Sequence, residues 1–255
     1  MNDDDLALAF ELAADAATIS LSWSGGDVPT TIKEDGSPVS EGDLEVDRVL
    51  SDILAEERPD DGVLSEEYPE RTGTSGRRWV IDPIDGTRQF ISGKPGWGNH
   101  IALEVDGAVV LGIITRPEDD ELFWAVRGEG AYRCGLDAPQ DRSRPLRLSS
   151  TADLAAATVG GYQSTPDDHI DLLTGRTTWA GRRASPITDY LTGELDALVL
   201  SGGKVWDYAP LAILAREAGG DVRSRDGGRA LDQEWILCSN GPLLQPLSQV
   251  MRIAG

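Results

Sequence analysis

The nine-residue stretch WVIDPIDGT, from Trp79 to Thr87, constrains the fold of this chain more than any other. It begins with three large apolar residues, which predict a buried β-strand. Pro83 removes a backbone donor, so we expect the strand to stop there. Asp82 and Asp85 then lie three residues apart on a bend. Gly86 allows a ligand to approach the backbone closely, and the residues that follow can begin a helix.

This bend combines two carboxylates with the start of a helix. The free amides and partial positive charge of a helix start favour a phosphate. Carboxylate oxygens are hard ligands and suit Mg²⁺ better than Zn²⁺. The stretch therefore predicts a site for a phosphate and a divalent cation. The alternative is structural: Asp82 ends the strand and Asp85 caps the helix.

The length of the chain limits its domain organisation. A chain of 255 residues can form one large domain or two smaller ones. The segment from Gly135 to Pro145 is rich in Asp, Pro and Arg and is the expected boundary. We expect an N-terminal α+β half at residues 1–140 and a C-terminal half at residues 141–255. Alternating strand-like and helix-like runs predict a layered α/β structure in the second half.

The net charge of −21 argues against a nucleic acid or an anionic membrane as a partner. No apolar run approaches the ~18 residues of a membrane span, and the first residues are acidic, unlike a signal peptide. We therefore expect a cytoplasmic protein. Cys134 and Cys238 form no CxxC motif, and His100 and His169 are the only histidines, which excludes a His-rich zinc site.

Two helices are expected before the central stretch. Asp4–Leu21 has the apolar spacing of an amphipathic helix, and residues 22–39 are expected to form a loop around Lys33. The run from Ser40 to Asp43 resembles a capping box that opens the second helix. Asp43 is therefore either a cap alone or a cap that also belongs to a site.

Further acids lie at the expected ends of other elements. Glu66 and Glu67 follow a short apolar run; paired glutamates usually mark a solvated surface, but at a strand end one of them could bind a metal. Asp207 precedes an apolar helix, and Pro210 is tolerated in a first helical turn, so Asp207 is expected as the N-cap. It is either only that cap or a third carboxylate of the site. Between these acids, Asp106-Gly107 predicts a β-hairpin.

Together these motifs resemble the inositol monophosphatase family of Mg²⁺-dependent, lithium-sensitive phosphatases. The matching segments are LSEE (Leu64–Glu67), WVIDPIDGT (Trp79–Thr87) and WDYAPLAILAREAGG (Trp206–Gly220), supported by KEDGSPVSEGD (Lys33–Asp43), GIITRP (Gly112–Pro117) and GEGAY (Gly128–Tyr132). They occur in the family's order and cover most of the chain. The resemblance implies an α/β fold, a layered αβαβα sandwich of the inositol monophosphatase and fructose-1,6-bisphosphatase type. It also implies a homodimer.

The resemblance further implies a role for each matching residue. Two or three Mg²⁺ ions would be held by four carboxylates and one backbone carbonyl, those of Glu66, Asp82, Asp85, Asp207 and Ile84. The amides of Gly86 and Thr87 would hold the phosphate. Glu66 and the Asp43–Thr87 pair would position and activate the water that attacks phosphorus. Lys33 would lie on the family's mobile metal loop.

The substrate-binding part departs from the family's pattern. Leu200 stands seven residues before Asp207, where members that cleave inositol phosphate or histidinol phosphate carry a glutamate. Arg182 and Arg183 replace a stretch of small residues and suggest a second anionic group on the substrate; two surface arginines are the alternative. Lys204 is a further candidate contact.

We therefore expect a metal-dependent phosphomonoesterase that acts on a small phosphorylated metabolite. Histidinol phosphate or a related biosynthetic intermediate ranks first, because the N-terminal half is similar to the histidinol-phosphatase branch. The segment GGKVWDYAP favours instead a nucleotide phosphatase acting on 3′-phosphoadenosine compounds or nucleoside phosphates. An inositol-1-phosphate phosphatase is another alternative. A non-catalytic regulatory binding protein is the alternative from a different class.

Overall fold

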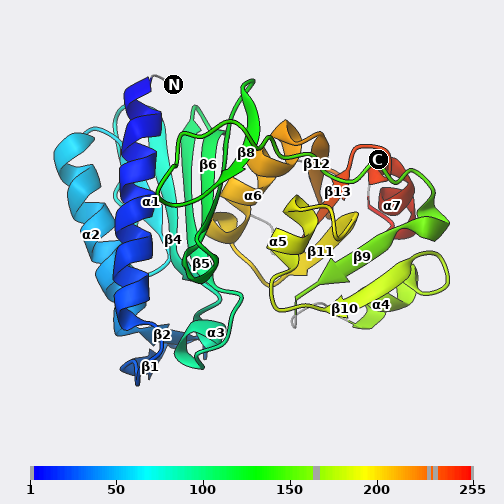
Figure 1. The fold of residues 1–255 in the computed structure, drawn as a ribbon, viewed down its shortest axis with the longest axis horizontal. Coiled ribbons are helices and arrows are strands. Elements are labelled where there is room, and N and C mark those ends of the chain that lie inside the picture. The colour runs from blue at the N-terminus through cyan, green and yellow to red at the C-terminus, as the bar shows by residue number, and fades with distance from the viewer. Residues whose placement is uncertain (1–2, 163–166, 229–230, 232–234, 254–255) are drawn as a thin grey trace.

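The computed structural model describes residues 3–162, 167–228, 231 and 235–253. Its elements form five layers in the order helix, sheet, helix, sheet, helix, as Figure 1 shows. The predicted αβαβα fold is therefore confirmed. Three hydrophobic cores lie between successive layers and hold them together.

The first two layers come from the N-terminal part of the chain. Helices α1 (Asp3–Trp23) and α2 (Glu41–Glu57) lie against one face of a six-stranded sheet. Its strands, in spatial order, are β3 (Gly62–Ser65), β4 (Arg77–Asp85), β5 (Gly98–Val105), β6 (Ala108–Arg116), β7 (Glu121–Val126) and β8 (Gly130–Cys134). Only β3 and β4 are parallel within this sheet, and β5 and β6 form the predicted hairpin.

The remaining layers come from the C-terminal part. Helices α5 (Pro186–Leu191) and α6 (Val205–Glu217) lie between the two sheets, and α4 (Asp167–Leu173) and α7 (Leu244–Val250) form the outer layer. The second sheet has the spatial order β10 (Thr178–Arg182), β9 (Thr158–Gly161), β11 (Ala197–Ser201), β13 (Trp235–Asn240) and β12 (Gly220–Ser224). The proposed division at residue 140 stays a prediction.

Both sheets are covered on two faces, so successive residues of one strand enter different cores. In β4, Val80 faces the core shared with α6, whereas Trp79 and Ile81 face α1 and α2. In β11, Leu198 and Leu200 face the same α6 core. This burial explains why these strands are continuous apolar runs rather than alternating ones.

Three smaller elements surround the central bend: β1 (Thr30–Ile32), β2 (Pro38–Ser40) and α3 (Thr87–Ile91). The segment expected as a loop at residues 22–39 was predicted only in part, because β1 and β2 pair as a short antiparallel hairpin. Two 3₁₀ turns complete the described elements, η1 (Pro117–Asp119) and η2 (Leu154–Ala156).

The prediction that the central strand stops at Pro83 is wrong. Strand β4 continues to Asp85, with an irregular register against β5 between Asp82 and Asp85. The other neighbour, β3, pairs only as far as Ile81, so the missing amide of Pro83 removes no bond from that side. A bulge of this kind re-aims side chains at the end of a strand.

Helix α1 corrects another expectation. Its residues from Asp4 to Trp23 are long and apolar enough to cross a membrane by length and composition, although no such run was expected. The apolar side chains of Leu8, Leu12 and Ala16 are, however, buried in the core against the six-stranded sheet. Packing within the protein therefore accounts for the composition of this helix.

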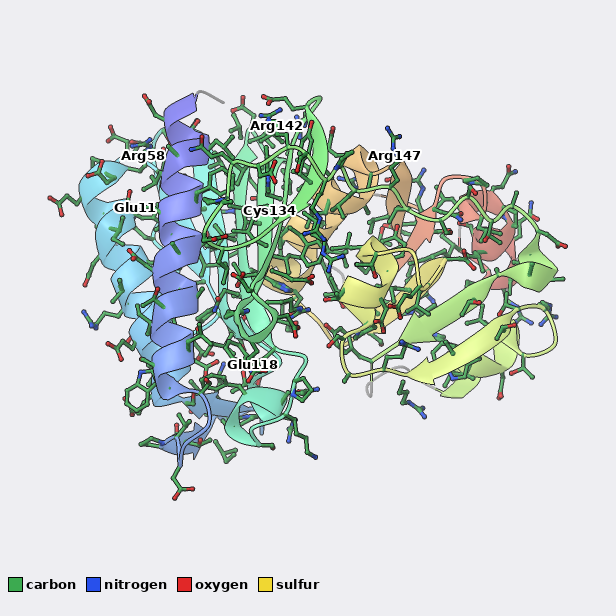
Figure 2. All side chains as sticks on the ribbon, viewed as in Figure 1. Glu11, Arg58, Glu118, Cys134, Arg142 and Arg147 are labelled. Carbon is green, nitrogen blue, oxygen red and sulfur yellow. The ribbon has the colours of Figure 1, made fainter. Side chains whose placement is uncertain are left out.

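Many charged side chains lie on the outer surface. Glu11 on α1 and Arg147 before β9 are exposed, as Figure 2 shows, whereas Cys134 on β8 is buried. Cys238 on β13 is buried as well, and both cysteines are free. Burial raises the pKa of both thiols, that of Cys134 to about 11. Neither cysteine is therefore a candidate nucleophile.

Candidate active site

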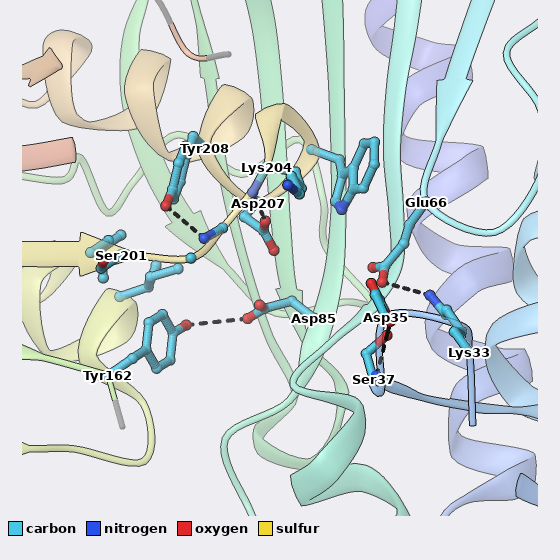
Figure 3. A pocket seen from close by; sticks show the side chains of 15 residues that line it. Lys33, Asp35, Ser37, Glu66, Asp85, Tyr162, Ser201, Lys204, Asp207 and Tyr208 are labelled. Carbon is cyan, nitrogen blue, oxygen red and sulfur yellow. Dashed lines mark hydrogen bonds and ion pairs between the residues drawn. The ribbon is translucent and has the colours of Figure 1, made fainter. Parts of the chain in front are cut away.

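A cavity of about 450 Å³ opens where the two halves of the chain meet (Figure 3). One side comes from the β1–β2 hairpin, the end of β3 and the end of β4. The other side comes from the segment after β9, from α5, and from the segment that joins β11 to α6. The lining residues are Lys33, Asp35, Ser37, Glu66, Asp85, Tyr162, Ile187, Leu200, Ser201, Gly202, Gly203, Lys204, Trp206, Asp207 and Tyr208.

The end of β4 supplies two acids of the site. Asp82 is only 1% exposed and lies opposite His100 of β5, whereas Asp85 lines the cavity. Asp85 is not the cap of α3. The N-cap is Gly86, which has a φ of 86° and no side-chain bond to the helix. A Cβ atom at Gly86 would lie 3.0 Å from the carbonyl oxygen of Gly96, so glycine is required by both conformation and space.

Glu66 follows the last residue of β3 and points toward the β1–β2 hairpin (Figure 3). The ammonium of Lys33 donates to Glu66 Oε1 at 2.8 Å and to Glu67 Oε1 at 2.7 Å. Asp47 of α2 holds the residues on either side of Glu66. Its Oδ2 accepts from the hydroxyl of Ser65 at 2.5 Å and from the amide of Glu67 at 3.1 Å.

Asp43 has a structural role and also belongs to the site. It forms the predicted capping box with Ser40, whose amide and hydroxyl donate to Asp43 Oδ2. Its other oxygen, Oδ1, lies 3.1 Å from the hydroxyl of Thr87. The same hydroxyl also lies 3.1 Å from the carbonyl oxygen of Ile84. The start of α2 is thereby joined to the end of β4 across 44 residues of chain.

Asp207 comes from the C-terminal half and is not the N-cap that was predicted. Lys204 occupies that position, and Asp207 is the third residue of α6, where its carboxylate accepts from the Lys204 amide. Pro210 is therefore deeper in the helix than its first turn. A carboxylate at the third position of a helix points back toward the first turn. The first turn of α6 faces the cavity, so Asp207 lines it.

Four acids, Glu66, Asp82, Asp85 and Asp207, form a cluster whose negative charges repel one another. Burial raises the pKa of Asp207 to about 7, and repulsion from Asp85 adds to the shift. Burial also raises the pKa of Asp82 well above its usual range, with further repulsion from Glu66 and Asp207. The pKa of Glu66 is raised by burial despite its pairing with Lys33. Bringing these carboxylates together therefore costs free energy that a cation in the cavity would offset.

Three residues that sequence analysis missed surround Oδ2 of Asp85. The hydroxyl of Tyr162 donates to it at 3.3 Å (Figure 3), His100 Nε2 lies 3.7 Å away, and Arg116 Nη1 lies 4.0 Å away. Burial, with a contribution from Arg116, lowers the pKa of His100 to about 4, so its ring is neutral at pH 7. No sequence pattern pointed to His100 or Tyr162. Arg116 left a weak signal, since it ends the otherwise apolar strand β6.

The predicted substrate contacts divide into two groups. Leu200 and Lys204, two of the predicted substrate contacts, line the cavity. Arg182, at the end of β10, is exposed, and neither it nor Arg183 is among the residues that line the cavity. Arg183 pairs with Asp189 and with Glu194 at 3.4 Å. The suggestion that these two arginines read a second anionic group therefore has no support in this arrangement.

The residues fit a hard divalent cation. Asp82, Asp85 and His100 each have a ligand atom within 4.8 Å of the others. Oδ1 of Asp82 is buried and has no hydrogen-bond partner among the described residues, which is costly for a carboxylate oxygen unless a cation or another donor approaches it. Apart from the His100 ring, the potential metal ligands of this cluster are carboxylate oxygens, which Mg²⁺ prefers.

The chain is similar to known proteins over most or all of its length. The model of the inositol monophosphatase family matches residues 1–252. A Streptomyces griseus protein named glucose-1-phosphate thymidylyltransferase is 42% identical over 256 residues, covering 100% of this chain and 98% of that protein. A histidinol-phosphatase of Mycobacterium tuberculosis is 35% identical over 238 residues, covering 89% and 90% of the two chains.

The fold is also similar to that of solved structures. The extragenic suppressor protein suhB of Bartonella henselae superposes with a TM-score of 0.85 at 26% sequence identity. The superposition covers 98% of this chain and 99% of the suhB chain. The five layers are therefore shared over nearly the whole length of both proteins.

Proposed function

Because this chain belongs to the inositol monophosphatase family of metal-dependent phosphomonoesterases, we propose that it hydrolyses the phosphate ester of a small biosynthetic metabolite, with histidinol phosphate ranked first. The observation that carries the proposal is the cluster formed by Glu66, Asp82, Asp85 and Asp207. These acids come from three separate segments of the chain, and three of them line one cavity while Asp82 is buried against it. Solvation alone gives no reason to bury such a cluster.

Magnesium is the proposed cofactor, as two or three ions. The proposed ligands are the four carboxylates of the cluster and the backbone carbonyl of Ile84. When bound, Mg²⁺ lowers the pKa of a water and offsets the negative charge of the phosphate. The deep burial of Asp82 supports its assignment as a ligand, because an isolated buried carboxylate would be expensive.

Two groups of this chain are proposed to prepare the attacking water. Glu66 lies beside the cavity with one oxygen held by Lys33, which leaves the other oxygen to accept a proton. Thr87 can donate its hydroxyl hydrogen to Asp43 and then accept a hydrogen bond from the water through its lone pair. Asp43 thereby fixes the direction of the Thr87 hydroxyl and acts through it.

The phosphate is proposed to bind at the amides of Gly86 and Thr87. The amides of Gln89 and Phe90 donate to the carbonyl of Gly86, so the helical turn itself uses the amides further along α3. The left-handed conformation of Gly86 directs the chain around the bend without a side chain in the way. This placement puts the phosphate beside Asp85 and within reach of the groups that prepare the water.

The organic part of the substrate is proposed to lie against the C-terminal side of the cavity. Its described residues include Tyr162, Leu200 and Trp206 and contribute no carboxylate beyond Asp207 of the cluster. Aromatic faces suit an imidazole ring and a nearby ammonium group through stacking and cation–π contact, which supports histidinol phosphate. Position 200 offers no carboxylate to the hydroxyls of inositol or to the ammonium of histidinol. Inositol 1-phosphate ranks lower because it has no aromatic ring to stack on this wall.

One experiment tests this function and its alternatives together. Release of phosphate is measured with and without Mg²⁺ for histidinol phosphate, inositol 1-phosphate and a 3′-phosphorylated adenosine. We expect Mg²⁺-dependent hydrolysis that Li⁺ inhibits, with the highest kcat/KM for histidinol phosphate. Absence of hydrolysis of every ester would favour a non-catalytic binding protein.

A parallel reaction addresses the name of the Streptomyces griseus relative. Incubation with dTTP and glucose 1-phosphate would yield dTDP-glucose and pyrophosphate if the protein were a nucleotidyltransferase, an outcome that would contradict a hydrolase. Measuring the mass of the protein in solution tests the proposed homodimer.

A further inference from the structure

Arg116 is a buried cation beside the acidic cluster. The residue is 2% exposed, lies at the end of β6, and places Nη1 4.0 Å from Oδ2 of Asp85. Within the described residues, neither Nη1 nor Nη2 has a hydrogen-bond partner. A guanidinium whose two terminal nitrogens lack partners is costly to bury, so the nearby carboxylate is the main compensation for its charge.

Neighbouring elements lie close to the Arg116 guanidinium on two sides. A Cβ atom at Gly98 of β5 would lie 2.0 Å from the carbonyl oxygen of Thr115 and 2.7 Å from Arg116 Nη1. The close approach of the two backbones therefore requires glycine, and its missing side chain also leaves the guanidinium next to β5. On the other side, Arg116 Nε donates to the hydroxyl of Thr188 on α5 at 3.1 Å. The guanidinium is thus held between the first sheet and a helix of the other half of the chain.

The positive charge of Arg116 affects any metal ion that binds to Asp85. The guanidinium of arginine is always charged in proteins, so this positive charge is permanent. His100 and Tyr162, the other neighbours of Asp85 Oδ2, contribute no permanent charge. Among the described residues, Arg116 is therefore the one permanent cation that pairs with Asp85, and any metal bound to this carboxylate must share it with the guanidinium.

We propose that Arg116 is a built-in counter-charge of the acidic cluster, which reduces the affinity of the site for Mg²⁺. This inference rests on the proposed function, because it assumes that Asp85 binds the metal. The positive guanidinium of Arg116 repels a divalent cation bound to the Asp85 carboxylate, and this repulsion is larger in a buried site than in water. The arginine therefore raises the Mg²⁺ concentration at which the cavity fills. It acts through Asp85 and does not need to contact the substrate.

The test compares Mg²⁺ binding by isothermal titration in the wild type, Arg116→Met and Arg116→Lys. Methionine has a similar reach and no charge, so we expect Arg116→Met to bind Mg²⁺ about tenfold more tightly, a change of ~1.4 kcal/mol. Lysine keeps the charge, so Arg116→Lys should stay within about threefold of the wild type. Arg216→Met is the matched control, because Arg216 is a half-buried arginine that pairs with Asp221 outside the cavity. Its Mg²⁺ affinity should equal that of the wild type.

The outcomes separate this inference from the function on which it rests. If the wild type binds no Mg²⁺ and releases no phosphate, the proposed function fails. If the wild type does both, but Arg116→Met binds Mg²⁺ equally or more weakly, only the counter-charge is overturned. Should Arg116→Met not fold, a change above tenfold in Arg116→Lys overturns the inference and wild-type-like affinity supports it. A raised KM and a raised inhibition constant for inorganic phosphate at unchanged Mg²⁺ affinity would assign Arg116 to substrate binding instead.

Discussion

The two sides of the cavity differ in chemistry and in how tightly they are built. The N-terminal side carries most of the acids, and hydrogen bonds within this side fix two of them: Asp43 through Ser40 and Thr87, and Glu66 through Lys33. The C-terminal side carries Leu200, Trp206 and Tyr162 beside the single acid Asp207. One side is thus suited to hold a metal and a phosphate, and the other to contact an organic group.

This difference teaches that reaction and selectivity can change separately. A carboxylate of the cluster interacts with several neighbours, so its loss affects the whole cluster. Leu200 contacts mainly the apolar core behind it, so a substitution there alters the cavity wall without altering the cluster. We therefore expect large effects on turnover from the acidic side and moderate effects on substrate choice from the apolar side.

The largest effect is expected from Asp85→Asn on the acidic side. Losing a proposed metal ligand removes several kcal/mol of transition-state stabilisation, so phosphate release should fall by roughly 10²- to 10³-fold or more. Asp52→Asn, an exposed acid on α2, is the matched control and should keep full activity. Circular dichroism checks that both variants fold. Undiminished turnover in Asp85→Asn, or full activity in excess EDTA, would contradict the assignment of the acidic side.

The next effect concerns stability and uses Asp82→Asn. Unit charges ~4 Å apart repel by up to ~4 kcal/mol at an effective dielectric of ~20, and protonation relieves part of this. Mg²⁺ at 100 times its dissociation constant should stabilise the wild type by ~2.7 kcal/mol, which raises its melting temperature by several degrees. We expect Asp82→Asn to lose this shift and to melt higher than the wild type without Mg²⁺. An unchanged response to Mg²⁺ would place the metal elsewhere.

A moderate effect is expected on the apolar side from Leu200→Glu. The new carboxylate can accept hydrogen bonds from substrate hydroxyls, each worth ~1–3 kcal/mol in a partly dry pocket. The ratio of kcat/KM for inositol 1-phosphate to that for a 3′-phosphorylated adenosine should therefore rise roughly 5- to 150-fold. Histidinol phosphate should gain as well, because its ammonium group can pair with the same carboxylate. Leu200→Met preserves volume and should leave the ratio unchanged. If inositol 1-phosphate is already the best substrate of the wild type, and Leu200→Glu does nothing, position 200 does not select the substrate.

The smallest effect is expected where the two sides meet, from Tyr162→Phe. This change removes the 3.3 Å hydrogen bond to Asp85 and leaves the ring against the cavity. A bond of this length contributes about 1 kcal/mol, so we expect about a fivefold loss in kcat/KM. Tyr132→Phe removes a hydroxyl outside the cavity and should have no effect on kcat/KM. A loss above 10²-fold in Tyr162→Phe would make Tyr162 part of the catalytic machinery rather than a support for Asp85.

The sequence by itself determined the fold class and located the candidate acids. The apolar runs and their turn residues located α1, α2, β4, the β5–β6 hairpin and α6, because buried faces leave a pattern in the chain. The second half was expected only as alternating strand-like and helix-like runs. Acids at the ends of these runs, such as Glu66 and Asp207, could be found because strand and helix ends are readable from the chain. Their assignment as ligands remains a proposal.

Only the tertiary structure decided what surrounds those acids. His100 reaches Asp85 because β5 pairs with β4, and Tyr162 reaches it because the second half of the chain packs against the first. The sequence left Arg182 and Arg183 as either substrate contacts or surface arginines, and only the folded chain pairs Arg183 with Asp189 and Glu194. Contacts between residues far apart in the chain depend on strand register and packing, which local patterns do not specify. The residues around Asp85 and the wall of the cavity are therefore properties of the folded chain.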